Sequence, residues 1–355
     1  MKVGFSLALA AFLATAPAAF AADDWSADLM VDATNKSPVY KPLPVGAVTK
    51  PWHLCVAFPH MKDAYYVAKD YGIMSEAKRQ GVSATIMAAS GYEAIAEQIQ
   101  QIEDCVASGG NAVLVNAVSK TALNNLIAEL AKKKIPVLDL GNGVTSDQIA
   151  AAALAQYYYA GATAGKYLAE KFPAGSGKKK MVWLAGPAGS QWVEDAVRGM
   201  KEAIAGSDID LLKVIYGDTG KAVQIKLIED AVQTYPDLAI IGGVAPAIEG
   251  AMEMAKSGEL KNKKLIAFYS TPPIEQAVRD GVVMATVDDN NLMGSRISVD
   301  QAIRILEGKL EVKVASRKFS IIDSGNINTY DRTTLLAPAD FKPVFSVEAP
   351  KKPGK

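Results

Sequence analysis

The sequence predicts an α/β protein built from two doubly wound, Rossmann-like lobes that are joined by a hinge. Short apolar runs alternate with helical segments of about 12–18 residues along most of the chain, a pattern typical of βαβ units and parallel sheets. The alternation occurs in two blocks of similar size, separated by a stretch rich in Gly and Ala at residues 141–156. With 355 residues, of which 50% are hydrophobic, the chain is long enough for two domains.

The first block shows a regular succession of strand and helix patterns. We expect strands at residues 54–58, 83–87, 112–115 and 137–140, and helices at 65–80, 92–106 and 121–133. Gly81 and the pair Gly109-Gly110 directly follow two of these helices, at the position where a glycine commonly ends a helix.

The second block repeats this pattern. We expect strands at residues 180–184, 211–216, 238–241, 265–268, 284–287 and 318–322, and helices at 192–205, 222–234, 247–257, 273–280 and 291–307. Doubly wound sheets bind ligands beyond the carboxyl ends of their strands. The space between two such lobes is therefore the expected binding site.

The first residues have the features of a secretory signal peptide. Lys2 supplies a positive charge, residues 3–15 form an apolar run, and Ala19-Phe20-Ala21 is typical of a cleavage site. A transmembrane helix needs about 20 apolar residues and would not end in this pattern, so an uncleaved anchor is the less favoured alternative. We expect cleavage after Ala21, which would leave a soluble protein in the periplasm.

The remaining boundaries follow from the same patterns. We expect a signal peptide at residues 1–21, an extended N-terminal arm at 22–50, an N-terminal lobe from 51–147 plus 290–315, a C-terminal lobe from 148–289 plus 316–345, and a tail at 346–355. The arm contains several prolines and shows no hydrophobic periodicity, which indicates an irregular, extended segment.

Cys55 and Cys105 are the two cysteines of the chain. In an exported protein an even pair is first interpreted as a disulfide, and a loop this long would constrain the unfolded chain by about 4 kcal/mol. Two separate buried thiols are the alternative. A zinc site is not expected, because only His53 and His60 lie nearby and structural zinc needs four clustered ligands.

Charge and motifs exclude several classes of function. The 38 basic side chains equal the 38 acidic ones, which argues against nucleic acid as a partner, since surfaces that bind polyanions show a basic excess. The sequence has no G-x-S-x-G, H-E-x-x-H or C-x-x-C motif, and the basic loop at residues 175–179 lacks the pattern of a P-loop. We expect no enzymatic activity, no cofactor and no metal.

Tyrosines and carboxylates gather where the predicted strands end. The candidate ligand-binding residues at this edge are Asp63, Tyr65, Tyr66, Tyr92, Tyr157, Tyr269, Asp288 and Asp289. Each tyrosine taken alone fits an ordinary core position, but their joint placement at the carboxyl ends of strands indicates a ligand site. Trp192 and Glu194, near the end of a strand of the second block, are secondary candidates.

Several short motifs resemble those of type I periplasmic binding proteins. The matching positions are Trp52, Leu54-Cys55, Pro59, Lys62-Asp63, Tyr65, Tyr71-Gly72, Gly91-Tyr92, Cys105, residues 165–168, Gly186-Pro187, residues 203–207, Phe268-Tyr269 and residues 301–304. The resemblance covers residues 51–345. Within the superfamily it is strongest to the periplasmic sensors of trimethylamine N-oxide that act with a membrane histidine kinase.

The resemblance implies a small methylated amine oxide bound in an aromatic box between the lobes. Carried over by position, the box consists of Tyr65, Tyr66, Tyr92, Tyr157 and Tyr269, with Asp63 as the polar partner. Tyr66 and Tyr157 depart from the family pattern, which has Trp at both positions. Trp has the stronger cation–π face, so the ligand here could be another methylated or quaternary amine, or a different small molecule.

The residues themselves also indicate an aromatic and acidic cleft. Sugar-binding relatives carry an Asp-Arg pair after their fourth strand, where this chain has Gly141-Asn142. A site for an anion would need Arg or Lys beside the cleft, and the nearest candidate, Arg198, is expected on the far side of its helix. Such a cleft suits a compact cation or a polarised N-oxide.

Two kinds of membrane partner stay open at this point. A sensor protein would present its closed form to a histidine kinase, whereas a transport protein would deliver a sugar or another small polar solute to an ABC permease. The motif block at residues 52–72 favours the sensor. An exported enzyme with a cleft active site is a third class, and the sequence offers no catalytic constellation for it.

Overall fold

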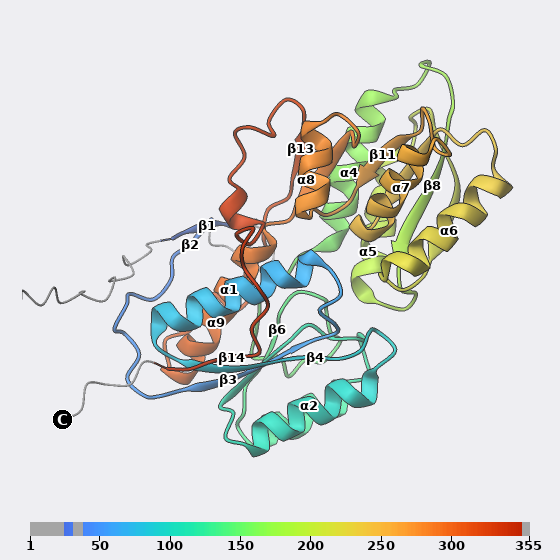
Figure 1. The fold of residues 1–355 in the computed structure, drawn as a ribbon. Helices are drawn as coiled ribbons and strands as arrows, with labels where there is room; N and C mark the ends of the chain where they lie inside the picture. The colour runs from blue at the N-terminus through green and yellow to red at the C-terminus, as the bar shows by residue number, and fades with distance from the viewer. Residues whose placement is uncertain (1–24, 31–37, 350–355) are drawn as a thin grey trace, which may run out of the picture.

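Figure 1 shows the fold of the protein in a computed structural model, which describes residues 25–30 and 38–349. The predicted signal peptide at residues 1–21 lies outside the described residues, as do residues 350–355 of the predicted tail. The chain forms two α/β lobes, as the sequence predicts, and each lobe contains one six-stranded sheet.

The N-terminal lobe contains a six-stranded sheet with the order β14-β4-β3-β5-β6-β7. Its strands are β3 (His53–Phe58), β4 (Ser83–Ala88), β5 (Ala112–Val115), β6 (Val137–Asp139), β7 (Ala151–Ala152) and β14 (Ser346–Val347). Only β14 runs antiparallel to its neighbour. The helices of this lobe are α1 (Ala64–Gln80), α2 (Ile95–Ala107), α3 (Asn124–Lys132) and α9 (Asn291–Leu306).

Side chains of β3 alternate between the two faces of this sheet, as they do in any strand. Leu54, Val56 and Phe58 belong to the core cluster that includes residues of α1, whereas Cys55 and Ala57 belong to a second cluster with residues of α2 and α3. Figure 1 shows α1 and α9 on one side of the sheet and α2 on the other. Helices therefore cover both faces, as a doubly wound fold requires.

The C-terminal lobe contains a second six-stranded sheet, with the order β13-β12-β11-β10-β8-β9. Its strands are β8 (Lys179–Gly186), β9 (Ile209–Tyr216), β10 (Ile240–Gly243), β11 (Lys264–Ala267), β12 (Ala285–Asp288) and β13 (Ser320–Asp323), and only β13 is antiparallel to its neighbour. The helices are α4 (Tyr157–Lys171), α5 (Gln191–Ile204), α6 (Lys221–Thr234), α7 (Ala245–Ser257) and α8 (Pro272–Arg279), with a short 3-10 helix, η1 (Arg332–Thr334), before the return to β14.

Helices α4 and α5 pack closely because glycines lie at their contact. A Cβ atom at Gly161 would lie 1.9 Å from the carbonyl oxygen of Ala196, and one at Gly199 would lie 1.9 Å from that of Tyr158. No larger residue fits at either position. This contact joins the start of α4 to the middle of α5. Tyr157 begins α4, and Trp192 lies in the first turn of α5.

Within residues 38–349 the chain crosses between the lobes four times. The first crossover leads from β7 to α4 through residues 153–156, the second from β12 to α9 through residues 289–290, the third from α9 to β13 through residues 307–319, and the fourth from β13 back to β14 through residues 324–345. The first and third run side by side, since the backbone N–H of Arg317 donates to the carbonyl of Leu154 at 3.2 Å. The first three crossovers form the hinge region.

Sheet membership differs from the expected lobe boundaries in two places. Strand β7, at Ala151–Ala152, pairs with β6 in the N-terminal sheet, although residues from 148 onward were expected in the other lobe. Strand β14, at Ser346–Val347, pairs with β4 in the same sheet, although residues 346–355 were expected to be a tail. Two-residue strands carry too little periodicity to be recognised in a sequence.

The N-terminal arm is more structured than the sequence indicates. Within the described part, β1 (Ala27–Asp28) and β2 (Val39–Tyr40) form an antiparallel pair. The rings of Trp25 and Tyr40 stack at 5.9 Å between centroids, and the Tyr40 hydroxyl donates to Asp300 on α9 at 2.7 Å. The arm is thus fastened to the N-terminal lobe.

A disulfide joins Cys55 on β3 to Cys105 on α2, which confirms the predicted pairing. The Cα atoms are 5.9 Å apart and the two residues are separated by 50 positions in the sequence. A Cβ atom at Gly110 would lie 2.2 Å from the Cys55 sulfur, so the glycine after α2 makes room for the bridge.

Candidate ligand-binding site

A cavity lies between the two lobes at the carboxyl ends of their strands. Its wall consists of Asp63, Tyr65, Tyr66, Tyr92, Asn142, Tyr157, Trp192, Thr219 and Tyr269. The space that these side chains leave free in the closed arrangement is small. The cavity therefore suits a guest with few non-hydrogen atoms.

The start of helix α1 places three of these residues. Asp63 is the N-cap, and its Oδ1 accepts hydrogen bonds from the backbone N–H of Tyr65 at 3.1 Å and of Tyr66 at 3.3 Å. Capping by an aspartate satisfies backbone donors that the helix itself cannot. The same bonds fix the carboxyl group beside both tyrosine side chains.

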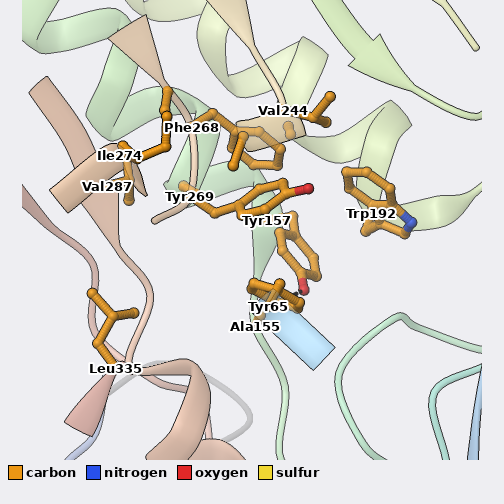
Figure 2. Packing of buried hydrophobic residues seen from close by; sticks show 14 of the residues in the cluster. Tyr65, Ala155, Tyr157, Trp192, Val244, Phe268, Tyr269, Ile274, Val287 and Leu335 are labelled. Atoms are coloured by element: carbon orange, nitrogen blue, oxygen red, sulfur yellow. Dashed lines mark hydrogen bonds between the residues drawn. The ribbon is translucent and has the colours of Figure 1, made fainter. Parts of the chain in front are cut away.

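The other aromatic residues lie after strands or at the starts of helices. Tyr92 lies between β4 and α2, Tyr157 is the first residue of α4, Trp192 lies in the first turn of α5, and Tyr269 follows β11. Figure 2 shows Tyr65 facing the group of Tyr157, Trp192 and Tyr269 across the site, with Phe268 packed beside them. Residues from both lobes thus meet around one space.

Hydroxyl groups join the tyrosines in pairs. The Tyr65 and Tyr157 oxygens are 2.8 Å apart, and those of Tyr66 and Tyr92 are 2.9 Å apart. The Nδ2 atom of Asn142 lies 3.5 Å from the Tyr92 hydroxyl. These contacts use the polar ends of the rings and leave aromatic surface toward the cavity.

The rings stand at large angles to one another, so they enclose the space from several directions. Tyr65 and Tyr269 have centroids 4.9 Å apart with 60° between their planes, and Tyr65 and Tyr66 are 5.5 Å apart at 81°. Trp192 lies 5.8 Å from Tyr157 and 6.1 Å from Tyr92. This arrangement is an aromatic box with contributions from both lobes.

Asp63 is the acidic group of the box. Burial raises its pKa to about 7, nearby Glu249 adds to the rise, and the hydrogen bonds from the Tyr66 and Tyr65 N–H groups oppose it. Near neutral pH the carboxyl group can therefore gain or lose a proton at low cost. It can donate a hydrogen bond when protonated and can balance a cation when ionised.

The tyrosine hydroxyls keep their protons at all ordinary pH values. Burial is the largest cause that raises the pKa of Tyr65, Tyr66 and Tyr269 well above the usual value, and it also raises the pKa of Tyr92 and Tyr157. The box therefore offers neutral rings and hydroxyl donors.

Two predicted site residues, Asp288 and Asp289, do not belong to the cavity wall. Asp288 accepts a hydrogen bond from the backbone N–H of Asn290 at 2.9 Å, just before helix α9. Asp289 accepts one from the Tyr65 hydroxyl at 2.8 Å. Asp288 is the last residue of β12 and Asp289 follows it, at the end of the strand as the sequence indicates, but the chain turns there into the second crossover.

The sequence predicts a cleft without Arg or Lys beside it, but two buried basic side chains, Lys69 and Arg317, lie near Tyr65. Lys69 on α1 donates to the carbonyl of Leu140 at 2.9 Å, and Arg317 on the third crossover pairs with Asp289. Burial holds the pKa of Lys69 well below its usual range, and Arg317 lowers it further. Neither residue belongs to a motif, so no sequence pattern indicates them.

Polar contacts between the lobes surround the cavity. Lys62 pairs with Asp218 at 3.5 Å, and Lys120 pairs with Glu194 at 2.5 Å. Glu194, the other secondary candidate, therefore lies at the rim rather than in the wall. Arg198 pairs with Asp195 on the exposed side of α5, as expected.

His60 is buried and contacts the opposite lobe, a role that the sequence did not predict. Its Nε2 lies 3.0 Å from the Thr219 hydroxyl, and its ring packs against Tyr66 and Tyr92 at 4.7 and 5.5 Å. Burial lowers the pKa of His60 to about 4, so the ring is neutral in this closed arrangement. Asn142 and Thr219 were also missed as wall residues.

The fold and the interlobe cavity define a binding protein with two hinged lobes. The Periplasmic binding protein domain family matches residues 54–310, and the chain belongs to this family, with the type I fold. Among curated relatives, Periplasmic protein TorT of Escherichia coli K12 is 27% identical over 298 residues, which cover 83% of this chain and 84% of the relative. The Ribose import binding protein RbsB of Salmonella typhimurium is 23% identical, with 70% of this chain and 83% of the relative covered.

Two solved structures extend these similarities. An ABC transporter solute binding protein from Bradyrhizobium sp. BTAi1, with bound Bis-Tris, is 45% identical with a TM-score of 0.76, and the match covers 93% of this chain and 100% of that one. TorT in complex with the TorS sensor domain in the presence of trimethylamine N-oxide is 29% identical with a TM-score of 0.75, covering 83% and 99%. The predicted resemblance to type I periplasmic binding proteins is confirmed, and TorT is among the relatives.

Within residues 25–30 and 38–349, no helix is both long enough and apolar enough to cross a membrane.

Proposed function

We propose that this protein is a periplasmic solute-binding protein whose lobes close on a compact methylated amine or amine N-oxide. The observation that carries the proposal is the box of six aromatic rings, drawn from both lobes, around the Asp63 carboxyl group. The residues Tyr65, Tyr66, Tyr92, Tyr157, Trp192 and Tyr269 would supply the faces, and Asp63 would supply the polar contact.

The chemistry of the wall favours a guest without negative charge. The nine residues that line the cavity include no Lys or Arg. A ring face within about 6 Å of an alkylated ammonium contributes roughly 0.5–2 kcal/mol when desolvated. Several faces together would bind such a group without an ion pair from arginine.

Asp63 lets the same box serve two related guests. As a carboxylate it would balance the charge of a quaternary ammonium, and as an acid it would donate to the oxygen of an N-oxide. Its pKa of about 7 makes both forms available near neutral pH. Glu249, whose carboxylate accepts from the Thr271 hydroxyl at 2.5 Å, keeps this end of the site acidic.

The comparisons support an amine or amine-oxide guest from two directions. The TorS–TorT complex is described with trimethylamine N-oxide, and the Bradyrhizobium protein is described with bound Bis-Tris, which is a tertiary amine with hydroxyl-bearing arms. Both guests present a substituted nitrogen surrounded by carbon atoms.

Signalling to a membrane sensor histidine kinase is the role we propose first, on the strength of the TorT resemblance. Closure shifts the population toward the ligand-bound form, by an amount set by the ligand's differential affinity. Uptake through an ABC permease is the second candidate, because the relative that is 45% identical is described as an ABC transporter solute binding protein. Either role requires export, for which residues 1–21 would be the signal peptide, cleaved after Ala21.

Calorimetric titration of the mature chain tests the ligand class. We expect saturable binding of trimethylamine N-oxide or choline, and weak or no binding of ribose and other pentoses. Binding of pentoses alone would contradict the proposal. Lys318→Gln, on the exposed part of the third crossover, is the matched control and should bind as the unmodified protein does.

The genomic neighbourhood and a direct binding assay separate the two roles. A neighbouring sensor kinase and response regulator would favour signalling, whereas permease and ATPase genes would favour uptake. Binding of the closed protein to the periplasmic domain of that kinase, measured with and without ligand, would then test the sensor role. Absence of binding in both conditions would exclude the sensor role.

A further inference from the structure

A buried ion pair connects the interlobe crossovers to the wall of the cavity. Asp289 belongs to the second crossover and Arg317 to the third, and each is 1% exposed. Arg317 Nη1 donates to the Asp289 carbonyl oxygen at 2.7 Å and lies 3.7 Å from Asp289 Oδ2. The same Oδ2 accepts a hydrogen bond from the Tyr65 hydroxyl at 2.8 Å, and Tyr65 meets Tyr157 there.

The backbone of Arg317 is held by the first crossover and by the N-terminal arm. Its N–H donates to the carbonyl of Leu154 at 3.2 Å, and the residue forms a bridge with Leu29 of the arm. Its side chain, in contrast, is bound to the second crossover. The first three crossovers therefore meet at Arg317, and a hinge rotation that moves them relative to one another must disturb these contacts.

The guanidinium group has little freedom to move away. A Cβ atom at Gly294, on α9, would lie 2.8 Å from both Cδ and Nε of Arg317, and one at Gly141 would lie 3.7 Å from Nη2. Loss of its carboxylate partner would leave a buried charge uncompensated, which is costly. The position of Arg317 is thus set jointly by Asp289 and by close packing.

We infer that Asp289 and Arg317 are positioning residues that couple the closed arrangement of the hinge to the two tyrosines, Tyr65 and Tyr157. Tyr65 belongs to the N-terminal lobe and Tyr157 to the C-terminal lobe, so their hydroxyl contact forms only when the lobes approach. Asp289 lies outside the cavity wall and acts through Tyr65. This inference rests on the proposed function, since it assigns the ion pair a task in closing the same site.

A double-mutant cycle tests the coupling. Asp289→Asn keeps the size and one acceptor oxygen but removes the charge that faces Arg317, and Tyr65→Phe removes the hydroxyl. With trimethylamine N-oxide as the probe, Asp289→Asn should lower affinity about tenfold in the unmodified background and have little further effect in the Tyr65→Phe background. The ligand-induced fall in radius of gyration, measured by small-angle scattering, should shrink in parallel.

Two further variants separate positioning from simple stabilisation. Gly294→Ala would displace the Arg317 side chain without changing any charge, so it should reproduce the loss of affinity and of closure. Lys318→Gln, which alters the neighbouring exposed cation that pairs with Asp28, should change neither. The inference is wrong if Asp289→Asn lowers the melting temperature while affinity and closure stay as in the unmodified protein, or if its effect is equally large with Tyr65→Phe.

Bis-Tris and ribose serve as second and third probes. Binding of ribose but of no amine would overturn the proposed ligand class, while the same cycle measured with ribose would still decide the coupling. Coupling that is absent with a probe that does bind would overturn the inference and leave the ligand class intact.

Discussion

The two lobes build their halves of the cavity by different physical means. The N-terminal half is held by hydrogen bonds, with Asp63 capping α1 and with the Tyr66, Tyr92 and Asn142 side chains in contact through their polar ends. The C-terminal half is held by ring packing, in which Trp192 and Phe268 stack at 6.0 Å with 8° between their planes. One half can therefore discriminate by polarity, while the other provides apolar surface.

The lobes also differ in how they are braced. The N-terminal lobe contains the disulfide Cys55–Cys105, which joins β3 to α2. The C-terminal lobe relies on the close α4–α5 contact at Gly161 and Gly199. We therefore expect removal of the disulfide in the N-terminal lobe to lower stability. Truncation of the aromatic wall in the C-terminal lobe should mainly weaken ligand binding.

Removal of the disulfide should have the largest effect. In the double variant Cys55→Ala/Cys105→Ala, the free energy of unfolding should fall by about 4 kcal/mol, because the unfolded chain regains the freedom of a 50-residue loop. Differential scanning calorimetry would measure this, with ligand affinity below the new melting temperature as the companion measurement. An unchanged melting temperature would show that the bridge does not brace this lobe.

Truncation of the C-terminal wall should have the next largest effect. Trp192→Ala removes a ring that faces both Tyr157 and Tyr92, and we expect ligand affinity to fall by about 1–2 kcal/mol. Tyr66→Phe, which keeps the ring in the N-terminal wall and removes one hydroxyl, should cost less than about 1 kcal/mol. Calorimetry on both variants compares the walls, and equal losses would contradict the distinction between them.

The acidic group makes binding to the N-terminal half depend on pH. A bound quaternary ammonium favours the Asp63 carboxylate and so lowers its pKa from about 7. Affinity for choline should therefore be full above about pH 7 and fall by up to tenfold per unit below it. Titrations across pH 5–8 measure this slope. Asp63→Asn should make the slope shallower without abolishing it, because protonation of His60, which is neutral when buried, weakens binding in the same direction and persists in that variant.

The stability of the ligand-free protein should respond to the same group with the opposite sign. A raised pKa favours the protonated acid in the folded state, so the contribution of Asp63 to stability is fully present below the model-compound value of 3.8 and is lost as pH rises to about 7. Thermal melting of the Asp63→Asn variant beside the unmodified protein isolates this contribution. A steeper loss of stability in the variant would contradict the assignment.

The smallest effect is expected at the rim. The Lys120–Glu194 pair spans the lobes but is substantially exposed, and such pairs contribute at most about 1 kcal/mol. Lys120→Met should weaken ligand binding slightly at low salt and not at all at high salt, because ions screen exposed charges. A large, salt-independent loss would mean that this pair belongs to the site itself.

The fold could be predicted because its strands and helices produce hydrophobic periodicities that extend over many residues. Alternating strands and helices determined the lobes, and Gly81 does end α1 in a left-handed conformation. The helix expected from residue 92 begins at Ile95, since boundaries depend on local turns. The strands β7 and β14 could not be predicted, because two residues are too few to show an alternation of hydrophobic and polar side chains.

The site was predictable as far as strand ends reveal it. Asp63 and the five tyrosines carry the signal of their position after strands, and so does Trp192 at the start of α5. Asp289 also follows a strand, yet the direction of its side chain depends on how the chain enters the second crossover. Lys69 and Arg317 are distant from any motif, and only the packing of α1 and the third crossover brings them together with Asp289.

A crystal structure of the mature protein with trimethylamine N-oxide or choline tests the central claim most directly. The account predicts the substituted nitrogen within about 6 Å of the ring centroids of Tyr65, Tyr157 and Trp192, with Asp63 as its polar neighbour. A guest bound elsewhere, or one held in this cavity away from the rings by other contacts, would contradict it.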